Sequence, residues 1–108
     1  MTSPGERIGH NEAVFRDVNE RIEAGHWPGE RGPVAFRCEC ARLGCNLLVE
    51  LSLSDYEEVR SDPRRFVLAA GHELPEDERV VERHAAYEVV EKYGAAGRAA
   101  EETDPRND

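Results

Sequence analysis

The sequence is poor in aromatic residues and has few hydrophobic residues overall. Aromatics make up 6% and hydrophobic residues 39% of the 108 residues, so the hydrophobic core that this chain can build is thin. A chain of this length predicts one domain, which buries roughly two thirds of its unfolded surface. In such a domain a local cross-link or a bound metal ion contributes more to stability than it does in a larger one.

Long apolar runs are also missing. No stretch approaches the roughly 20 residues that span a bilayer, and the opening MTSPGERIGH lacks the apolar segment of a signal peptide. These absences favour a cytoplasmic protein that does not bind membranes. The cytoplasm keeps thiols reduced, so clustered cysteines indicate metal or redox chemistry before structural disulfides.

Positive charge is scarce. Fourteen basic residues face 23 acidic ones, which gives a net charge of −9, and Lys92 is the only lysine. An acidic surface repels phosphate groups, so the composition disfavours binding to nucleic acid or to anionic membranes by this chain alone. A protein partner with a basic surface remains open, and solubility by itself also explains the charge.

The first third of the chain predicts a flexible lead followed by a helix. Residues 1–10 show no pattern, whereas Asn11 can cap a helix over residues 11–24. Val14, Val18 and Ile22 recur every four residues and form a narrow apolar stripe. We expect this stripe either to pack on the domain or to contact a partner.

The middle of the chain predicts short strands and one short helix. Residues 34–38 and 47–53 alternate in polarity, which is typical of two strands of a hairpin. Ser54 begins the motif SDYE, which has the spacing of a capping box. The helix that it opens should end before Pro63, because a residue preceding proline avoids the helical region. Residues 65–69 then predict another strand.

The C-terminal third is ambiguous in sequence. Residues 79–92 are compatible with two strands around Ala85 and Ala86, or with one helix whose apolar residues recur every fourth position. The alanine pair is a poor hairpin turn, which favours the helix. Residues 94–108 have the composition of a disordered acidic tail.

All three cysteines lie in one short segment, as Cys38, Cys40 and Cys45. In extended chain the first two project to the same side, because side chains alternate with period two, and Glu39 projects away. Gly44 can adopt the left-handed conformation that returns Cys45 toward them. The segment therefore predicts a knuckle that offers three thiolates to zinc, which prefers four tetrahedral ligands.

The fourth ligand has to come from elsewhere, and His72 is the best candidate. It follows Gly71 at the end of a predicted strand, where another part of the chain can approach closely. The other histidines, His10, His26 and His84, lie in the flexible lead, in a loop and in the ambiguous region. A carboxylate or a water molecule in the fourth position also stays open.

Other interpretations of the cysteines stay open. They can be small buried residues, ligands of an iron–sulfur cluster, or a redox pair of Cys40 and Cys45, because a disulfide between Cys38 and Cys40 is strained. Glu73 adjoins His72 and could act as a base at a catalytic zinc. However, Glu73 follows His72 directly, unlike the H-x-E of the zinc deaminases, and no P-C-x-x-C accompanies it; the H-E-x-x-H, P-loop and G-x-S-x-G motifs are missing.

The motifs FRCEC, SDYEEVRSDPRRFVLAAGHE and ERVVERHAAYEVVEK resemble a group of small, mostly uncharacterised proteins from actinobacteria and related bacteria, and the resemblance extends over roughly residues 11–105. Members commonly read F-x-C-E-C-G, a third cysteine, and then P-G-H-E, with Asp-Gly between the last two apolar runs. This chain differs in having Ala41, Ala70 and the pair Ala85-Ala86 at three of those positions. The resemblance implies that His72 belongs to the site and that residues 79–92 form a hairpin, but it implies no activity.

The sequence thus predicts a single α+β domain over residues 11–93. The domain has an N-terminal helix, a small antiparallel sheet with a zinc knuckle at a hairpin turn, and one short helix. Its predicted metal ligands are Cys38, Cys40, Cys45 and His72. The predicted function is that of a zinc-binding, non-catalytic interaction or regulatory module with a protein partner. The alternatives are a zinc-dependent redox switch and, less favoured, a zinc-dependent hydrolase.

Overall fold

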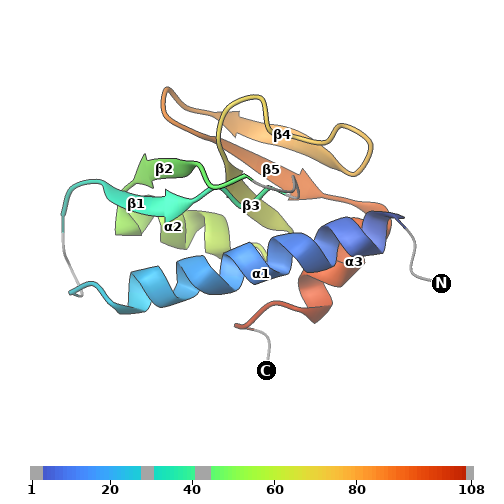
Figure 1. Ribbon diagram of the computed structural model, residues 1–108, viewed down its shortest axis with the longest axis horizontal. Coiled ribbons are helices and arrows are strands. Elements are labelled where there is room, and N and C mark those ends of the chain that lie inside the picture. The colour runs from blue at the N-terminus through green and yellow to red at the C-terminus, as the bar shows by residue number, and fades with distance from the viewer. Residues whose placement is uncertain (1–3, 28–30, 41–44, 107–108) are drawn as a thin grey trace.

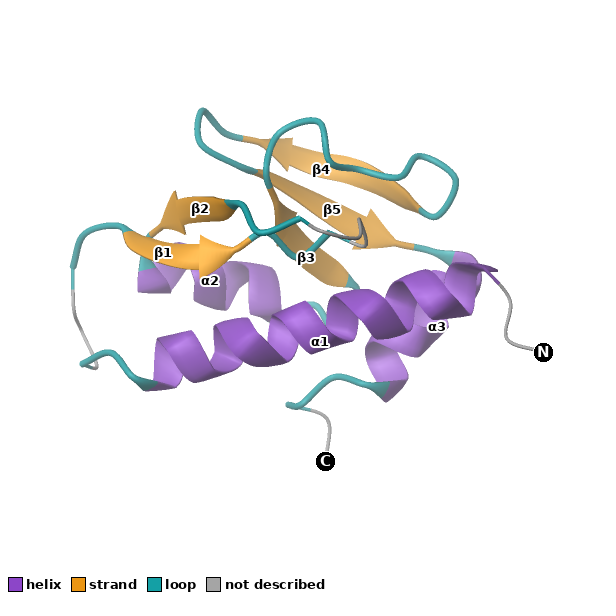
Figure 2. Cartoon of the chain, viewed as in Figure 1, coloured by secondary structure: helices purple, strands orange, loops and turns teal. Residues whose placement is uncertain are grey.

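The computed structural model describes residues 4–27, 31–40 and 45–106, and the side chains from Val14 onward. The chain forms three helices and five strands within these residues (Figures 1 and 2). In chain order they are α1 (Pro4–Ala24), β1 (Val34–Arg37), β2 (Leu48–Leu51), α2 (Leu53–Arg60), β3 (Arg65–Leu68), β4 (Glu78–Arg83), β5 (Glu88–Lys92) and α3 (Gly94–Glu102).

The strands form two small antiparallel sheets, and the predicted α+β class is confirmed. β1 pairs with β2, from Val34 opposite Leu51 to Arg37 opposite Leu48. The second sheet has the order β3-β5-β4. Cys38 and Cys40 come directly after β1 and Cys45 comes shortly before β2, so the cysteine segment connects the two strands of a hairpin, as predicted.

Two apolar clusters make up the core, and both reach the cysteine segment. One is centred on Phe36, whose ring stacks on Tyr56 of α2 with centroids 4.3 Å apart. The other contains Phe66 of β3 together with Cys38 and Cys40. The first two cysteines are therefore part of the core, while their sulfur atoms remain close to the loop that follows β3.

The first helix is longer than predicted and buries a different face. It begins at Pro4, so residues 4–10 belong to it and do not form a flexible lead. Val14 and Val18, on the predicted apolar stripe, are 61% and 37% exposed, whereas Arg16 and Asn19 are fully buried. Burial of these polar side chains is possible because each finds hydrogen-bond partners on other elements.

The short helix α2 begins earlier than predicted. Its N-cap is Ser52, whose hydroxyl accepts a hydrogen bond from the backbone N–H of Asp55 at 3.0 Å, and Ser54 lies inside the helix. The sequence contains two serines in suitable positions, and Leu53 at the first helical position packs against the core. The helix ends at Arg60, before Pro63, as predicted.

The C-terminal third forms a hairpin followed by a helix. β4 and β5 pair across residues 84–87, where the N–H of His84 donates to Tyr87 O at 2.8 Å. Residues 94–102 form α3, which differs from the disordered tail that the sequence predicts. Ala96, Ala99 and Ala100 are buried, and α3 lies beside α1 (Figure 1). Small alanine side chains permit this close approach, which composition alone does not reveal.

Two buried basic side chains form ion pairs. The Lys92 ammonium and the Glu78 carboxylate form an ion pair in which both side chains are almost inaccessible to solvent. The Arg60 guanidinium, also buried, binds Glu20 of α1 and Asp104 beyond α3. Such pairs tie distant elements together, because leaving either partner alone in the interior is costly. Among the described helices, none is long and apolar enough to cross a membrane.

Candidate metal centre

Four side chains from two loops converge on one point near the core. They are Cys38, Cys40, Cys45 and His72, and their ligand atoms all lie within 4.8 Å of one another. Three come from the connection between β1 and β2, and His72 comes from the loop after β3. The structure thus brings together all four residues that the sequence singles out, and this group could hold a metal ion.

The distances within this group match those around a single tetrahedral ion. The Nδ1 atom of His72 lies 3.6 Å from Sγ of Cys45 and 3.7 Å from Sγ of Cys38. Ligands of a tetrahedral zinc, with bonds of about 2.3 Å to sulfur and about 2.0 Å to nitrogen, are about 3.5 Å apart. The three thiols are free and form no disulfide. The donor set and its spacing therefore fit one metal ion.

Hydrogen bonds from backbone N–H groups connect the loop after β3 to Cys38 and close the turn within that loop. The N–H of Ala69 points at the sulfur of Cys38, 3.1 Å away, and the N–H of His72 donates to Ala69 O at 3.1 Å. Between them Gly71 has a φ of +84°, a conformation that a side chain rarely tolerates. This tight turn places the imidazole over the cysteines. The turn predicted at residues 41–44, including the left-handed conformation of Gly44, lies outside the described residues.

The thiols differ in how readily they ionise. Burial raises the pKa of the Cys38 thiol to about 12, although the Ala69 N–H favours its thiolate form. Burial also opposes ionisation of the half-exposed Cys45, but the N–H of Leu47, the other two thiols and Arg37 together outweigh it. The pKa of Cys45 is lowered as a result. A bound cation would favour thiolates at every position, because metal ligation requires the deprotonated sulfur.

Glu73, the candidate base beside His72, is engaged elsewhere. It hydrogen-bonds to Glu88, whose side chain is 1% exposed and which also accepts a hydrogen bond from the N–H of Gly71. Burial, followed by the hydrogen bond and negative charge of Glu73, raises the pKa of Glu88 to about 7. Glu73 is thus bound to Glu88, whose carboxylate also pairs with Arg83 at 3.3 Å.

The other histidines do not join the described cluster. His84 pairs with Glu82 at 2.9 Å and stacks on the ring of Tyr87. His26 follows α1 and is not part of the four-residue group. The side chain of His10 lies outside the described residues.

Sequence reasoning missed the side chains that support the knuckle from inside. Glu39 is fully buried, and its carboxylate accepts hydrogen bonds from Asn19 at 2.8 Å, Tyr56 at 3.0 Å and the N–H of Val67 at 2.9 Å. Burial raises the pKa of Glu39, and these three donors oppose that rise. Period-two alternation shows only that Glu39 projects away from the sulfurs. No sequence signal identifies its partners, which lie 17 to 28 positions away.

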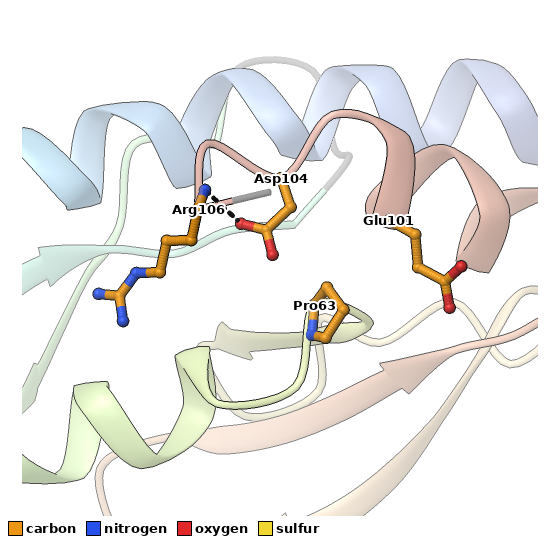
Figure 3. Close-up of a pocket in the computed structure, with 4 residues that line it drawn as sticks. All are labelled: Pro63, Glu101, Asp104 and Arg106. Carbon is orange, nitrogen blue, oxygen red and sulfur yellow. Dashed lines mark hydrogen bonds between the residues drawn. The ribbon is translucent and has the colours of Figure 1, made fainter. Parts of the chain in front are cut away.

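A surface cavity of about 330 Å³ lies apart from the cysteines, between the loop after α2 and the C-terminal segment (Figure 3). Pro63, Glu101, Asp104 and Arg106 line it. Its charged residues are already bound within the protein: Asp104 to Arg60, Glu101 to Arg64, and Arg106 to three glutamates. The charged groups that line this cavity therefore already have partners within the protein, which makes it a poor candidate for a ligand site.

The fold and the four clustered side chains define a small α+β protein with a thiol- and imidazole-rich site that could hold a metal ion. Comparison of the chain with protein-family models, with curated proteins and with solved structures found no match. A proposal for the function of this protein therefore rests on the chemistry of the site.

Proposed function

We propose that this is a zinc-binding protein in which Cys38, Cys40, Cys45 and His72 hold one structural zinc ion. The carrying observation is the separation of 3.6 and 3.7 Å between the His72 nitrogen and two cysteine sulfurs. Sulfur-rich tetrahedral sites with one imidazole are typical of zinc. An iron–sulfur cluster would distribute its ligands over several iron atoms, whereas these four donor atoms all lie within 4.8 Å of one another.

A structural role is favoured over catalysis because four protein ligands leave no position for a reactive water. Glu73, which a hydrolase would need as a base, is paired with Glu88. The energetics agree: a bound ion adds about 4 kcal/mol when free zinc exceeds the dissociation constant a thousandfold, which is a large share of the about 5–15 kcal/mol by which a small domain is stable. The ion would join the knuckle to the loop after β3 and stabilise the arrangement of both sheets.

We further propose that the stabilised domain contacts a protein partner in the cytoplasm. The exposed apolar residues Val14 and Val18 on α1 support a contact there, within a chain of net charge −9. Because Val14 is 61% exposed, Val14→Asp should leave folding intact and abolish capture of a partner that uses this face. Val14→Ala serves as the matched control. Capture unchanged in Val14→Asp would exclude α1 as the contact.

Native mass spectrometry of the tag-free protein tests the metal site. We expect one zinc ion per chain in the wild type and loss or weaker retention of zinc in His72→Ala. His84→Ala, which removes an exposed imidazole outside the cluster, should retain one ion and serves as the control. A wild-type chain that carries no metal, with three free thiols, would refute the proposal.

A further inference from the structure

Glu39 connects the proposed metal ligands to three other elements. It stands between Cys38 and Cys40 and is fully buried. Its Oε2 atom accepts hydrogen bonds from Asn19 of α1 and Tyr56 of α2, and its Oε1 atom accepts one from the N–H of Val67 in β3. Its own N–H donates to Val67 O at 2.8 Å. Every one of these contacts depends on where the backbone between the two cysteines lies.

The proposed metal would determine that position. When the side chains of Cys38 and Cys40 both reach one ion, the peptide between them is fixed and the intervening side chain has to project to the opposite side. Opposite the sulfurs lies the interior, where Glu39 meets its donors. Without the ion, two neutral thiols impose no such constraint, and a carboxylate gains free energy by moving toward water.

The seating of α1 on β1 depends on this side chain, together with Ile22, which packs against the core cluster that includes Phe36. Asn19, fully buried, donates through Nδ2 to both Glu39 and Arg37 O, and its Oδ1 accepts from the N–H of Arg37 at 2.7 Å. The valines of the same helix, Val14 and Val18, are exposed. Hydrogen bonds weaken steeply with misalignment, so a small displacement of Glu39 breaks its bond to Asn19 and leaves Asn19 held by the Arg37 backbone.

We infer that metal occupancy controls the seating of α1, with Glu39 as the side chain that transmits the state of the site. This inference rests on the proposed zinc site. Loss of the ion displaces Glu39, Asn19 loses a partner, and α1 loosens from β1. The anchors of α1 to the other side of the fold, Arg16 on Ala100 O and Glu20 on Arg60, do not touch the knuckle and remain.

Two backbone amides report directly on this connection. The N–H of Val67 is held by the Glu39 carboxylate and the N–H of Arg37 by the Asn19 side chain. Two others serve as internal controls, because their acceptors are neither Glu39 nor Asn19: His84 N–H donates to Tyr87 O, and Lys92 N–H donates to Arg64 O. Local release and global unfolding therefore give different exchange patterns.

The test is amide hydrogen exchange by NMR on the full chain, with one equivalent of zinc and after its removal by a chelator. We expect exchange at Val67 and Arg37 to accelerate by about tenfold or more, and exchange at His84 and Lys92 to change by less than about twofold. Unchanged protection at Val67 and Arg37 would overturn the inference. So would equal acceleration at all four amides, since that reports unfolding of the whole domain.

Asn19→Ala separates the connection from metal binding. Asn19 is not a ligand, so the variant should still hold one zinc ion, but its Arg37 amide should exchange rapidly whether or not zinc is present. Asp17→Ala, at an exposed position of the same helix, should behave like the wild type. If Asn19→Ala fails to fold, Glu39→Gln, which keeps the shape and one acceptor oxygen, should reduce the zinc dependence of exchange at Arg37.

The two hypotheses fail in distinguishable ways. If the wild type binds no zinc by mass spectrometry, the proposed function fails and this inference fails with it. If the chain binds one zinc ion but Asn19→Ala shows the same zinc-dependent protection of Arg37 as the wild type, only the connection through Glu39 and Asn19 is refuted.

Discussion

Zinc loading at neutral pH should release between two and three protons per ion. Each ligating cysteine has to lose its proton, so the count measures how many thiols bind. Burial raises the pKa of Cys38 to about 12, so this thiol is fully protonated at pH 7 and releases one whole proton. The pKa of Cys45 is lowered, so Cys45 releases a smaller fraction, which decreases further as the pH rises.

The same count determines how zinc affinity depends on pH. With two to three protons released, the apparent affinity should weaken by about two to three orders of magnitude for each pH unit below 7. The stability that zinc adds follows from that affinity, at about 4 kcal/mol when free zinc exceeds the dissociation constant a thousandfold. Zinc-loaded protein should therefore lose this extra stability as the solution is acidified.

Titration calorimetry in buffers of different ionisation enthalpy measures the proton count. The matched variant is His72→Ala, which removes one ligand but no thiol, so the variant should bind zinc more weakly and yet release a similar number of protons. Cys38→Ser should lower the count by about one, because it removes the thiol with the raised pKa. A wild-type release of one proton or fewer would show that the three thiols do not ligate together.

Two further predictions concern stability. Lys92→Met should destabilise the zinc-loaded domain by about 3–5 kcal/mol, because it leaves the buried Glu78 carboxylate without its cation. Urea unfolding should show that the double variant Lys92→Met/Glu78→Gln regains most of this stability. A free energy of unfolding for Lys92→Met within about 1 kcal/mol of wild type contradicts the argument. The second uses Glu23, whose pKa is raised to about 7 by burial and by its hydrogen bond to Glu57. The folded state favours the protonated form of Glu23, so its contribution to stability is complete near pH 4.5 and is lost as the pH rises to 7. The melting temperature of Glu23→Gln should therefore exceed that of wild type at pH 8.5, and by a smaller margin at pH 5.5. An equal difference in melting temperature at both pH values would refute this assignment.

The candidate site could be predicted largely from sequence because three of its four residues lie within one short segment. Three cysteines in one short segment, with alternation placing Cys38 and Cys40 on one side, require no knowledge of the fold. His72 follows a strand and a glycine, and the structure places its imidazole beside the thiols. The support behind the site could not be predicted, because Glu39 meets Asn19 and Tyr56 only after α1 and α2 have packed.

Two sequence predictions, one from the periodicity of α1 and one from the composition of the C-terminal segment, differ from the structure. The stripe of Val14, Val18 and Ile22 predicts a face that packs on the domain or contacts a partner. Ile22 packs against the core, whereas Val14 and Val18 are exposed. The helix also buries Arg16 and Asn19, which donate hydrogen bonds to distant carbonyl and carboxylate oxygens. Similarly, residues 94–102 have a composition typical of disorder but fold as α3, because their alanines fit closely against α1. Both outcomes depend on partners far away in the sequence.

Local patterns in the chain indicate the α+β class, the hairpin that carries the cysteines, and the common side of Cys38 and Cys40, because alternation and turn-forming residues act within a few positions. His72 lies 34 positions from Cys38 and 27 from Cys45, and folding brings it to them. Folding also sets which face of α1 is buried, the pairing of β4 with β5, and the contacts of Glu39 with three other elements. A buried polar group is stable only where partners from other elements meet it, and those partners are distant in the sequence.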